Sequence, residues 1–91
     1  MFHIVVYDIA VDARRVKLAH ALEDFGTRVQ WSVFECLLTE SQLTAMMARI
    51  TPLVDVATDS LRVYRLCGAC EQVVSVIGRT AVTRDPEVYI L

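Results

Sequence analysis

The first strand-forming run of the sequence, residues 2–9, constrains the fold most because it is apolar on both of its faces. Its even-numbered and odd-numbered positions are both mostly apolar, which is typical of a central strand covered on two sides. The chain has 91 residues, one domain's length, and 55% of them are hydrophobic. That fraction is above the usual range for a small soluble domain and indicates a subunit interface.

Asp8 lies at the expected end of this apolar strand. An ionised carboxylate is costly at an inward-facing strand position unless something neutralises or solvates it. At a strand end it can instead point into a crevice, which is a common place for functional side chains. The alternative is a structural role in which Asp8 caps the loop to Asp12. Position alone does not decide between these two roles.

The rest of the sequence alternates between helical and strand periodicity. Asp12 is the expected N-cap of a first helix that stops at Gly26. Thr39 and Gln42 form the expected capping box of a second helix, which Pro52 disturbs or ends. Period-two segments predict strands at residues 27–38, 61–67, 73–77 and 88–91. The first of these is long for one strand, so we expect a bend or a bulge in it.

This order suits one α+β domain over residues 1–91, a ferredoxin-like sandwich with an antiparallel sheet and both helices on one face. Periodicity alone leaves a βαβαββ order open. No apolar run approaches the ~20 residues that cross a bilayer, and the N-terminus lacks a signal peptide's pattern. Three cysteines, an odd number, then favour reduced thiols in a cytoplasmic protein that has no membrane partner.

Three cations, Arg14, Arg15 and Lys17, crowd the first turns of the first predicted helix. Cations are unfavourable there, so a bound phosphate or an acidic partner would relieve them. The alternative is a solvated face balanced by Asp12 and Glu23. Because the formal net charge is −2, nucleic-acid binding would have to rest on such a local cluster. Three residues on the next strand could extend a phosphate-contacting surface: Arg28, Gln30 and Ser32.

The segment "CGAC", Cys67 to Cys70, has the C-x-x-C spacing of redox and zinc sites. A zinc site needs four ligands, and neither a second pair nor a nearby histidine is present in sequence. A redox pair opens a helix after a strand, whereas this segment predicts a turn. We therefore favour inert reduced thiols over metal binding or redox chemistry.

The sequence offers little support for chemistry by a nucleophilic side chain. It has no Gly-rich phosphate loop, no Ser-His-Asp order and no His-Glu-x-x-His run. The remaining candidate is metal-assisted attack of water on a phosphodiester, with Asp8 as the metal ligand. We expect Trp31 and Phe34 to be core or interface residues rather than base-stacking platforms.

The combination of "VVYDI", a downstream arginine and "G.RVQ.SVFEC" resembles the CRISPR-associated protein two family. These small dimeric proteins of spacer acquisition are often called CRISPR-associated endoribonucleases. The resemblance centres on residues 1–38. The matching positions are Val5–Ile9, Arg15, Gly26, Arg28–Gln30 and Ser32–Cys36.

The resemblance implies a ferredoxin-like homodimer in which the sheets of the two subunits face each other. Residues 27–38 would be split into two strands near Ser32–Glu35 or strongly bent, and residues 78–91 would extend as a strand onto the partner. Asp8 of each subunit would approach the twofold axis, where the pair could bind one Mg²⁺ or Mn²⁺. Around this pair, Arg15 and Arg28 would hold phosphates, and Tyr7 and Phe34 would shape the site.

The resemblance implies two classes of function. In one, the dimer is a scaffold that joins the CRISPR integrase and holds double-stranded pre-spacer DNA. In the other, the Asp8 pair cuts RNA or DNA with a metal ion. We favour the scaffold, with endonuclease activity as an additional property. A stand-alone, toxin-like ribonuclease of similar fold is the alternative.

Overall fold

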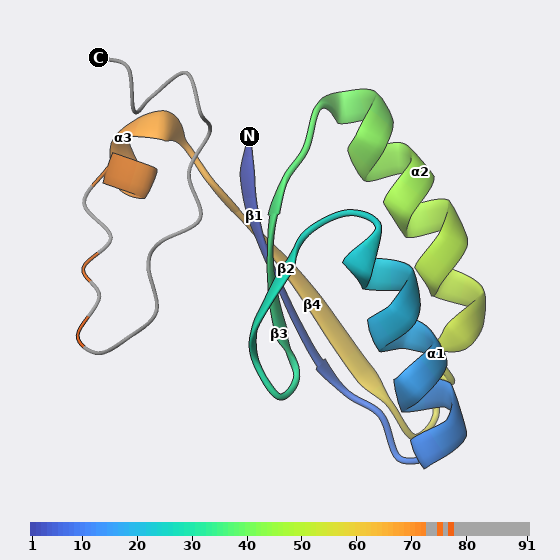
Figure 1. The fold of residues 1–91 in the computed structure, drawn as a ribbon. Coiled ribbons are helices and arrows are strands. Elements are labelled where there is room, and N and C mark those ends of the chain that lie inside the picture. Colours follow the sequence, from blue (N-terminus) through green and yellow to red (C-terminus); the bar gives the residue numbers. More distant parts are fainter. Residues whose placement is uncertain (73–74, 76, 78–91) are drawn as a thin grey trace.

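The computed structural model describes residues 1–72, Ser75 and Ile77. Four strands form one antiparallel sheet in the order β2-β3-β1-β4, and helices α1 and α2 lie on one face of it (Figure 1). This arrangement confirms the ferredoxin-like prediction. The elements in chain order are β1 (Phe2–Asp8), α1 (Asp12–Glu23), β2 (Thr27–Gln30), β3 (Val33–Leu37), α2 (Glu40–Ile50), η1 (Thr51–Leu53), β4 (Ser60–Leu66) and α3 (Gly68–Gln72).

Several predictions concern the C-terminal part of the chain. The strands predicted at 73–77 and 88–91 and the extension at 78–91 fall outside the described residues, apart from Ser75 and Ile77. Within the described residues, no helix has the length and apolar character that crossing a membrane requires.

The predicted strand at 27–38 is two strands, β2 and β3, joined by a turn at Trp31 and Ser32. The pairing shifts register between Arg28, which lies opposite Phe34, and Gln30, which lies opposite Val33. This bulge places Arg28 and Gln30 on opposite faces of the sheet. Arg28 and Gln30 therefore cannot contribute to one phosphate-contacting surface on the same face of the sheet.

The helix termini agree with the sequence at α2 and differ from it at α1. The predicted capping box is present, since Gln42 donates its backbone N–H to Thr39 Oγ1 (3.2 Å) and Gln42 Oε1 accepts from the Thr39 N–H (2.8 Å). Helix α2 ends before Pro52, which lies in η1. In α1, however, the N-cap is Val11 and Asp12 is already helical. Asp12 instead pairs with Arg15 along the helix.

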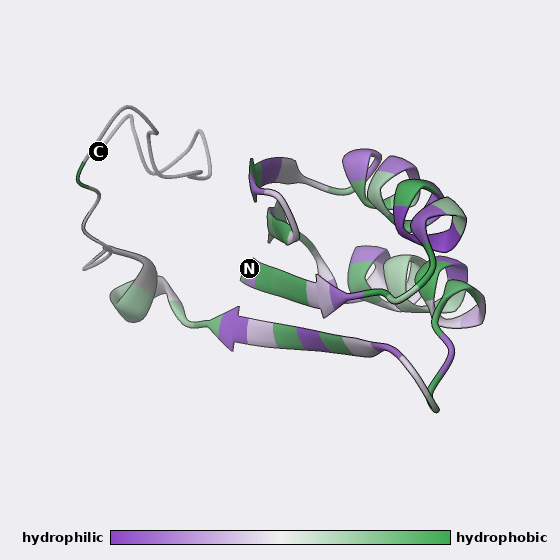
Figure 2. Cartoon of the chain, turned by 90° about the horizontal axis from the view of Figure 1, so that it is seen from below, coloured by the Kyte–Doolittle hydropathy of each residue, from purple (hydrophilic) through white to green (hydrophobic). Residues whose placement is uncertain are grey.

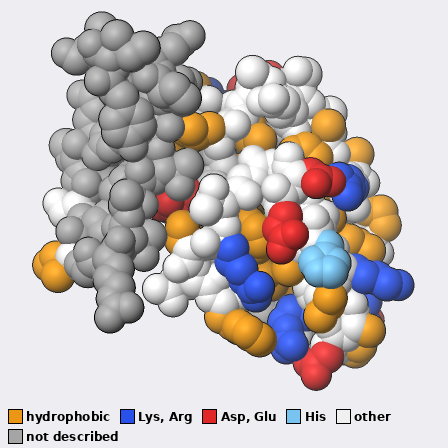
Figure 3. Space-filling view, viewed as in Figure 1, with side chains coloured by type: hydrophobic (Ala, Val, Ile, Leu, Met, Phe, Trp, Pro, Cys, Tyr) orange, Lys and Arg blue, Asp and Glu red, His pale blue; other side chains and the backbone are white. Residues whose placement is uncertain are grey.

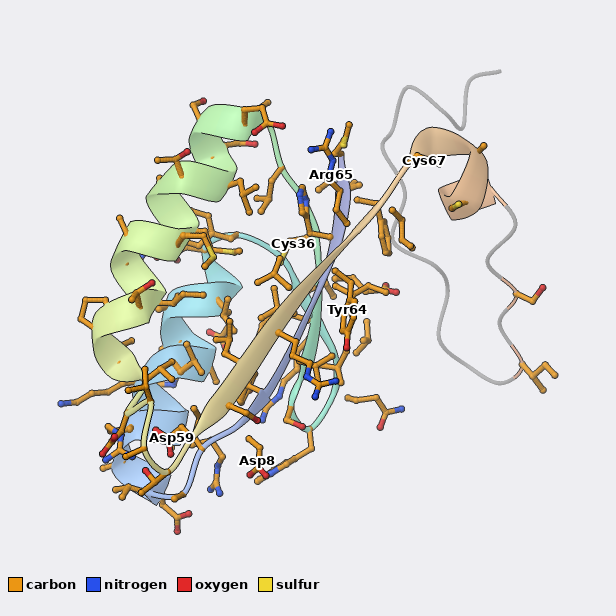
Figure 4. The ribbon with its side chains drawn as sticks, turned by 180° about the vertical axis from the view of Figure 1, so that it is seen from behind. Asp8, Cys36, Asp59, Tyr64, Arg65 and Cys67 are labelled. Carbon is orange, nitrogen blue, oxygen red and sulfur yellow. The ribbon has the colours of Figure 1, made fainter. Side chains whose placement is uncertain are left out.

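The two faces of the sheet have different surroundings. Val5, Tyr7, Phe34 and Cys36 are buried beneath the helices, with Leu18, Leu22, Met46 and Ile50 packed on them. The opposite, open face carries apolar side chains that are only partly covered: Ile4, Val6, Val33, Leu37, Tyr64 and Leu66. Figure 2 shows hydrophobic and hydrophilic residues alternating along β4, and Figure 4 shows Tyr64 on the side away from the helices.

Candidate nucleic-acid interface

Asp8 ends β1 on the open face, opposite Ser60 of β4, and its side chain is exposed (Figure 4). Within the described residues its carboxylate makes no hydrogen bond or ion pair. The loop that Asp8 could have capped is capped by another residue, because Ala10 donates its N–H to Asp59 Oδ1 at 2.9 Å. Asp8 therefore does not cap this loop, and the Asp8 carboxylate is available to a ligand.

Asp59, just before β4, is the residue that organises this end of the sheet. It accepts hydrogen bonds from the backbone N–H groups of Ala10 (2.9 Å) and Asp55 (2.9 Å) and from Arg14 Nη2 (2.8 Å). The two backbone donors are the largest cause that holds the pKa of Asp59 well below its usual range. Sequence reasoning missed Asp59, because its partner Ala10 is 49 positions away.

The three predicted cations of α1 do not form one patch. Arg14 is half-buried and ion-paired with Asp59, whose side chain has no exposed surface. Lys17 is exposed and has no hydrogen bond or ion pair within the part of the chain described. Arg15 alone turns toward the β2–β3 turn. Nucleic-acid contacts by Arg14 and Lys17 remain predictions, and Arg14 already has a counter-charge.

Arg15 and Arg28 meet at Trp31. Their guanidinium carbons lie 5.1 Å and 5.0 Å from the centroid of the indole ring, within the range of cation–π attraction. Arg28 also donates from Nε (3.1 Å) and Nη2 (2.6 Å) to the Trp31 carbonyl oxygen. Trp31 is 67% exposed, so of the two predicted roles, core or interface, the structure excludes the core.

The predicted site-shaping residues lie at different depths. Tyr7 is buried toward the helices, and its hydroxyl donates to the Trp31 carbonyl oxygen at 3.4 Å. Burial raises the pKa of Tyr7, and the nearby Arg28 and Arg15 partly offset this effect. Phe34 is fully buried on the helix side, 6.3 Å from Tyr7 between ring centroids. Phe34 can therefore shape the site only by packing beneath it.

Two hollows flank the Arg15–Trp31 contact. One, of about 360 Å³, is lined by Asp8, Arg15, Trp31 and Ser32 together with Val6, Tyr7 and Ile9. The other, of about 170 Å³, is lined by Arg15, Arg28, Trp31, Glu23, His20, Val16 and Ala19. In Figure 3, basic side chains gather over the α1 side of the molecule, with acidic ones among them. The fold thus brings Asp8 and Ser32 together with Arg15 in one hollow and Arg28 together with Arg15 in the other, and Trp31 lines both.

Asp8 is the predicted ligand of a divalent cation, and one chain supplies this carboxylate without a cluster of further ligands among the described residues. Within the described residues there is no group of three or more histidine, cysteine or acidic side chains that could hold a metal ion. Asp8 contributes a carboxylate, which is the oxygen ligand that Mg²⁺ prefers, and Mg²⁺ is commonly held by one or two carboxylates plus waters. The donor set fits such an ion with waters completing the shell, and Asp8 of a second copy would supply a second carboxylate.

The Cys67–Cys70 segment differs from the turn that the sequence predicted. Cys67 directly follows β4, and Cys70 lies in the short helix α3 beyond the end of the sheet (Figure 1). Hydrogen bonds from the backbone and the thiol of Cys70 lower the pKa of Cys67, and the same interaction raises the pKa of Cys70. Both cysteines are free and exposed, whereas Cys36 is free and buried.

The chain is similar to CRISPR-associated Cas2 proteins in sequence and in structure. Residues 1–74 match the family model described as CRISPR associated protein Cas2. The CRISPR-associated endoribonuclease Cas2 1 of Chloroflexus aurantiacus is 43% identical over 79 residues, 86% of this chain and 85% of that protein. Streptococcus pyogenes Cas2, solved at pH 6.5, has a TM-score of 0.74 and 34% identity, covering 86% of this chain and 100% of that one. A chain of a partial Cas6-RT-Cas1–Cas2 complex has a TM-score of 0.68 and 26% identity, covering 84% and 89%.

Proposed function

Because the chain belongs to the CRISPR-associated Cas2 family, we propose that it acts in CRISPR adaptation as a homodimer that binds double-stranded pre-spacer DNA and the CRISPR integrase. The similar chain in a solved Cas6-RT-Cas1–Cas2 complex supports an integrase partner. The protein would work in the cytoplasm, where its free thiols would stay reduced.

The observation that carries this proposal is the open face of the sheet. Antiparallel sheets with one solvated face normally carry polar residues on it. Here that face presents Ile4, Val6, Val33 and Tyr64, and burying such apolar surface is favourable by about 25 cal/mol per Å². Pairing with the same face of a second copy would cover these side chains in a symmetric interface. It would also bring two copies of the sheet end that holds Asp8 into one assembly.

A spacer-acquisition assay tests the proposal together with the oligomeric state. Val6→Lys places a charge on the open face, so we expect a monomer by light scattering and no new spacers in cells. Val56→Lys is the matched control, because Val56 is 93% exposed in the loop before β4. That variant should remain dimeric and active. A Val6→Lys variant that stays dimeric and acquires spacers would refute the proposed interface.

The second candidate function is metal-dependent cleavage of RNA or DNA, which the exposed Asp8 carboxylate favours because it has no hydrogen bond or ion pair among the described residues. Two such carboxylates near a twofold axis would repel each other, and a cation held between them would offset this repulsion. A bound Mg²⁺ or Mn²⁺ would polarise a phosphate and supply an activated water. Asp8 would hold the ion, Arg15 and Arg28 would hold neighbouring phosphates, and Ser32 would line the wall beside them.

Asp8→Asn separates cleavage from scaffolding, because the amide keeps the shape of the side chain and removes its charge. We expect the variant to keep spacer acquisition and to lose any metal-dependent cleavage. Loss of both activities would make hydrolysis part of the biological role. A toxin-like ribonuclease would instead be indicated by a gene with no CRISPR locus beside it.

A further inference from the structure

We infer that Trp31, with Arg15 and Arg28 beside it, is a stacking site for an unpaired nucleobase of a bound nucleic acid. The inference rests on the proposed nucleic-acid binding and adds a substrate class to it, namely nucleic acid with a single-stranded segment or end. Double-stranded DNA alone would be held through its phosphates and would leave Trp31 without a base to contact.

The indole ring is held in place although it is exposed. The Trp31 carbonyl oxygen accepts two hydrogen bonds from Arg28 and one from the hydroxyl of the buried Tyr7. The turn that carries the ring is further tied to β1, because Tyr7 donates its backbone N–H to the Ser32 carbonyl oxygen at 3.1 Å. Two guanidinium groups contact a ring that is still 67% exposed. A fixed aromatic surface of this kind loses little conformational freedom when a ligand stacks on it.

The two arginines are held differently, which gives them different roles. Arg28 is fixed by its two hydrogen bonds to the Trp31 carbonyl. Arg15 is fixed by one ion pair to Asp12 (2.8 Å), whose side chain is 84% exposed, and such exposed pairs are weak. An arriving nucleotide can therefore draw Arg15 onto its phosphate, while Arg28 holds the turn through Nε and Nη2 and offers its other N–H donors to a neighbouring phosphate. A ligand can reach the indole ring from solvent, because a hollow lies on each side of the Arg15–Trp31 contact.

The chemistry of the cluster favours a base over other ligands. An aromatic ring with adjacent cations is the pattern by which proteins bind single strands, with bases stacking on the ring and phosphates on the cations. Base–aromatic stacking contributes about one to two orders of magnitude in affinity. Bases inside a duplex are covered by their neighbours, so a ring on a surface turn can reach only an unpaired base. Because every base has a π-face, we expect little sequence preference.

Trp31 is the only tryptophan of the sequence, so intrinsic fluorescence reports on this ring alone. The wild-type protein is titrated with a labelled single strand, a blunt duplex and a duplex with a single-stranded end, while label anisotropy measures binding. We expect the single strand and the tailed duplex to quench Trp31, and the blunt duplex to bind without quenching it. Trp31→Ala should lower the affinity for the tailed duplex about 5- to 150-fold relative to the blunt one. Trp31→Phe should keep most of the preference, and Val56→Ala, at another exposed apolar position, should keep all of it.

The outcomes separate this inference from the proposed function. The stacking site would be overturned if the anisotropy shows that all probes bind but none quenches Trp31. It would also be overturned if Trp31→Ala lost the same affinity for blunt and tailed duplexes. Both outcomes would leave duplex binding intact. A blue shift of Trp31 emission with protein concentration, with no response to nucleic acid, would assign the ring to a protein interface and also overturn it. No binding of any probe would overturn the proposed function together with the inference.

Discussion

Gly26 links α1 to the β2–β3 hairpin that carries Arg28 and Trp31, and its replacement by alanine tests why the hairpin lies where it does. A Cβ at this position would overlap the carbonyl oxygen of Glu35 and the sulfur of Cys36 in β3. Overpacking costs about 1–3 kcal/mol, and we expect the upper half of that range because a ladder carbonyl cannot easily move. Alanine returns up to about 1 kcal/mol by restricting the unfolded chain. The net loss of about 1–2 kcal/mol corresponds to a fall in Tm of about 4–16 °C.

The assay is thermal unfolding followed by circular dichroism, at equal protein concentrations because dimerisation would shift Tm. Gly68→Ala is the matched control, since a Cβ on Gly68 at the start of α3 meets no atom within 4 Å. That change should leave Tm the same or raise it slightly. If Gly26→Ala were as stable as Gly68→Ala, the close approach of Gly26 to β3 would not be what fixes the hairpin.

Two further predictions concern titratable groups. The pKa of Asp59 is depressed in the folded state, so its stabilising contribution is present above its unfolded pKa of about 3.8 and is lost as the pH falls below that value. Asp59→Asn should flatten this acid-side loss in urea unfolding curves recorded across the pH range, and an unchanged curve would contradict the role of the Ala10–Asp59 contact. Alkylation at mildly alkaline pH, mapped by mass spectrometry, should modify Cys67 faster than Cys70, because their pKa values shift in opposite directions. Cys36, whose pKa burial raises to about 11, should react only on unfolding, and equal rates for the three thiols would contradict these assignments.

Much of the fold could be predicted because its signals are local. The capping box needs only residues three positions apart, because Thr39 is the N-cap of α2 and Gln42 lies in the first turn of that helix. The split of residues 27–38 was implied by the resemblance, with the break expected near Ser32–Glu35 and found at Trp31 and Ser32. Helix α1 begins one residue earlier than predicted, because Asp12 pairs with Arg15 within the helix instead of serving as its N-cap.

The candidate site was less accessible to sequence reasoning because its key contacts join distant segments. Nothing near Asp59 in the sequence indicates that it binds Ala10 and Arg14. The contact with Asp59 gives Arg14, a predicted phosphate-binding residue, a counter-charge within the protein. The hydrophobicity of Trp31 predicts a core or an interface residue, and its place in a turn between two short strands, 67% exposed, excludes only the core. The C-x-x-C segment was misread as a turn, since the glycine within it opens α3. Asp8 and Arg28 line separate hollows, and only the fold shows that Arg15 and Trp31 belong to both.

The most direct test of the account is the salt dependence of duplex DNA binding by Arg28→Ala, measured by anisotropy. The logarithm of the binding constant falls linearly with the logarithm of the salt concentration, with a slope of about −0.9 for each phosphate contact. Losing one contact per subunit should therefore make this slope shallower by about 0.9 to 1.8 in a dimer. Arg49→Ala is the control, because Arg49 lies on α2 and pairs with Asp24. The account predicts a shallower slope for Arg28→Ala alone. Identical slopes for wild type and both variants would contradict an interface centred on Arg15, Arg28 and Trp31.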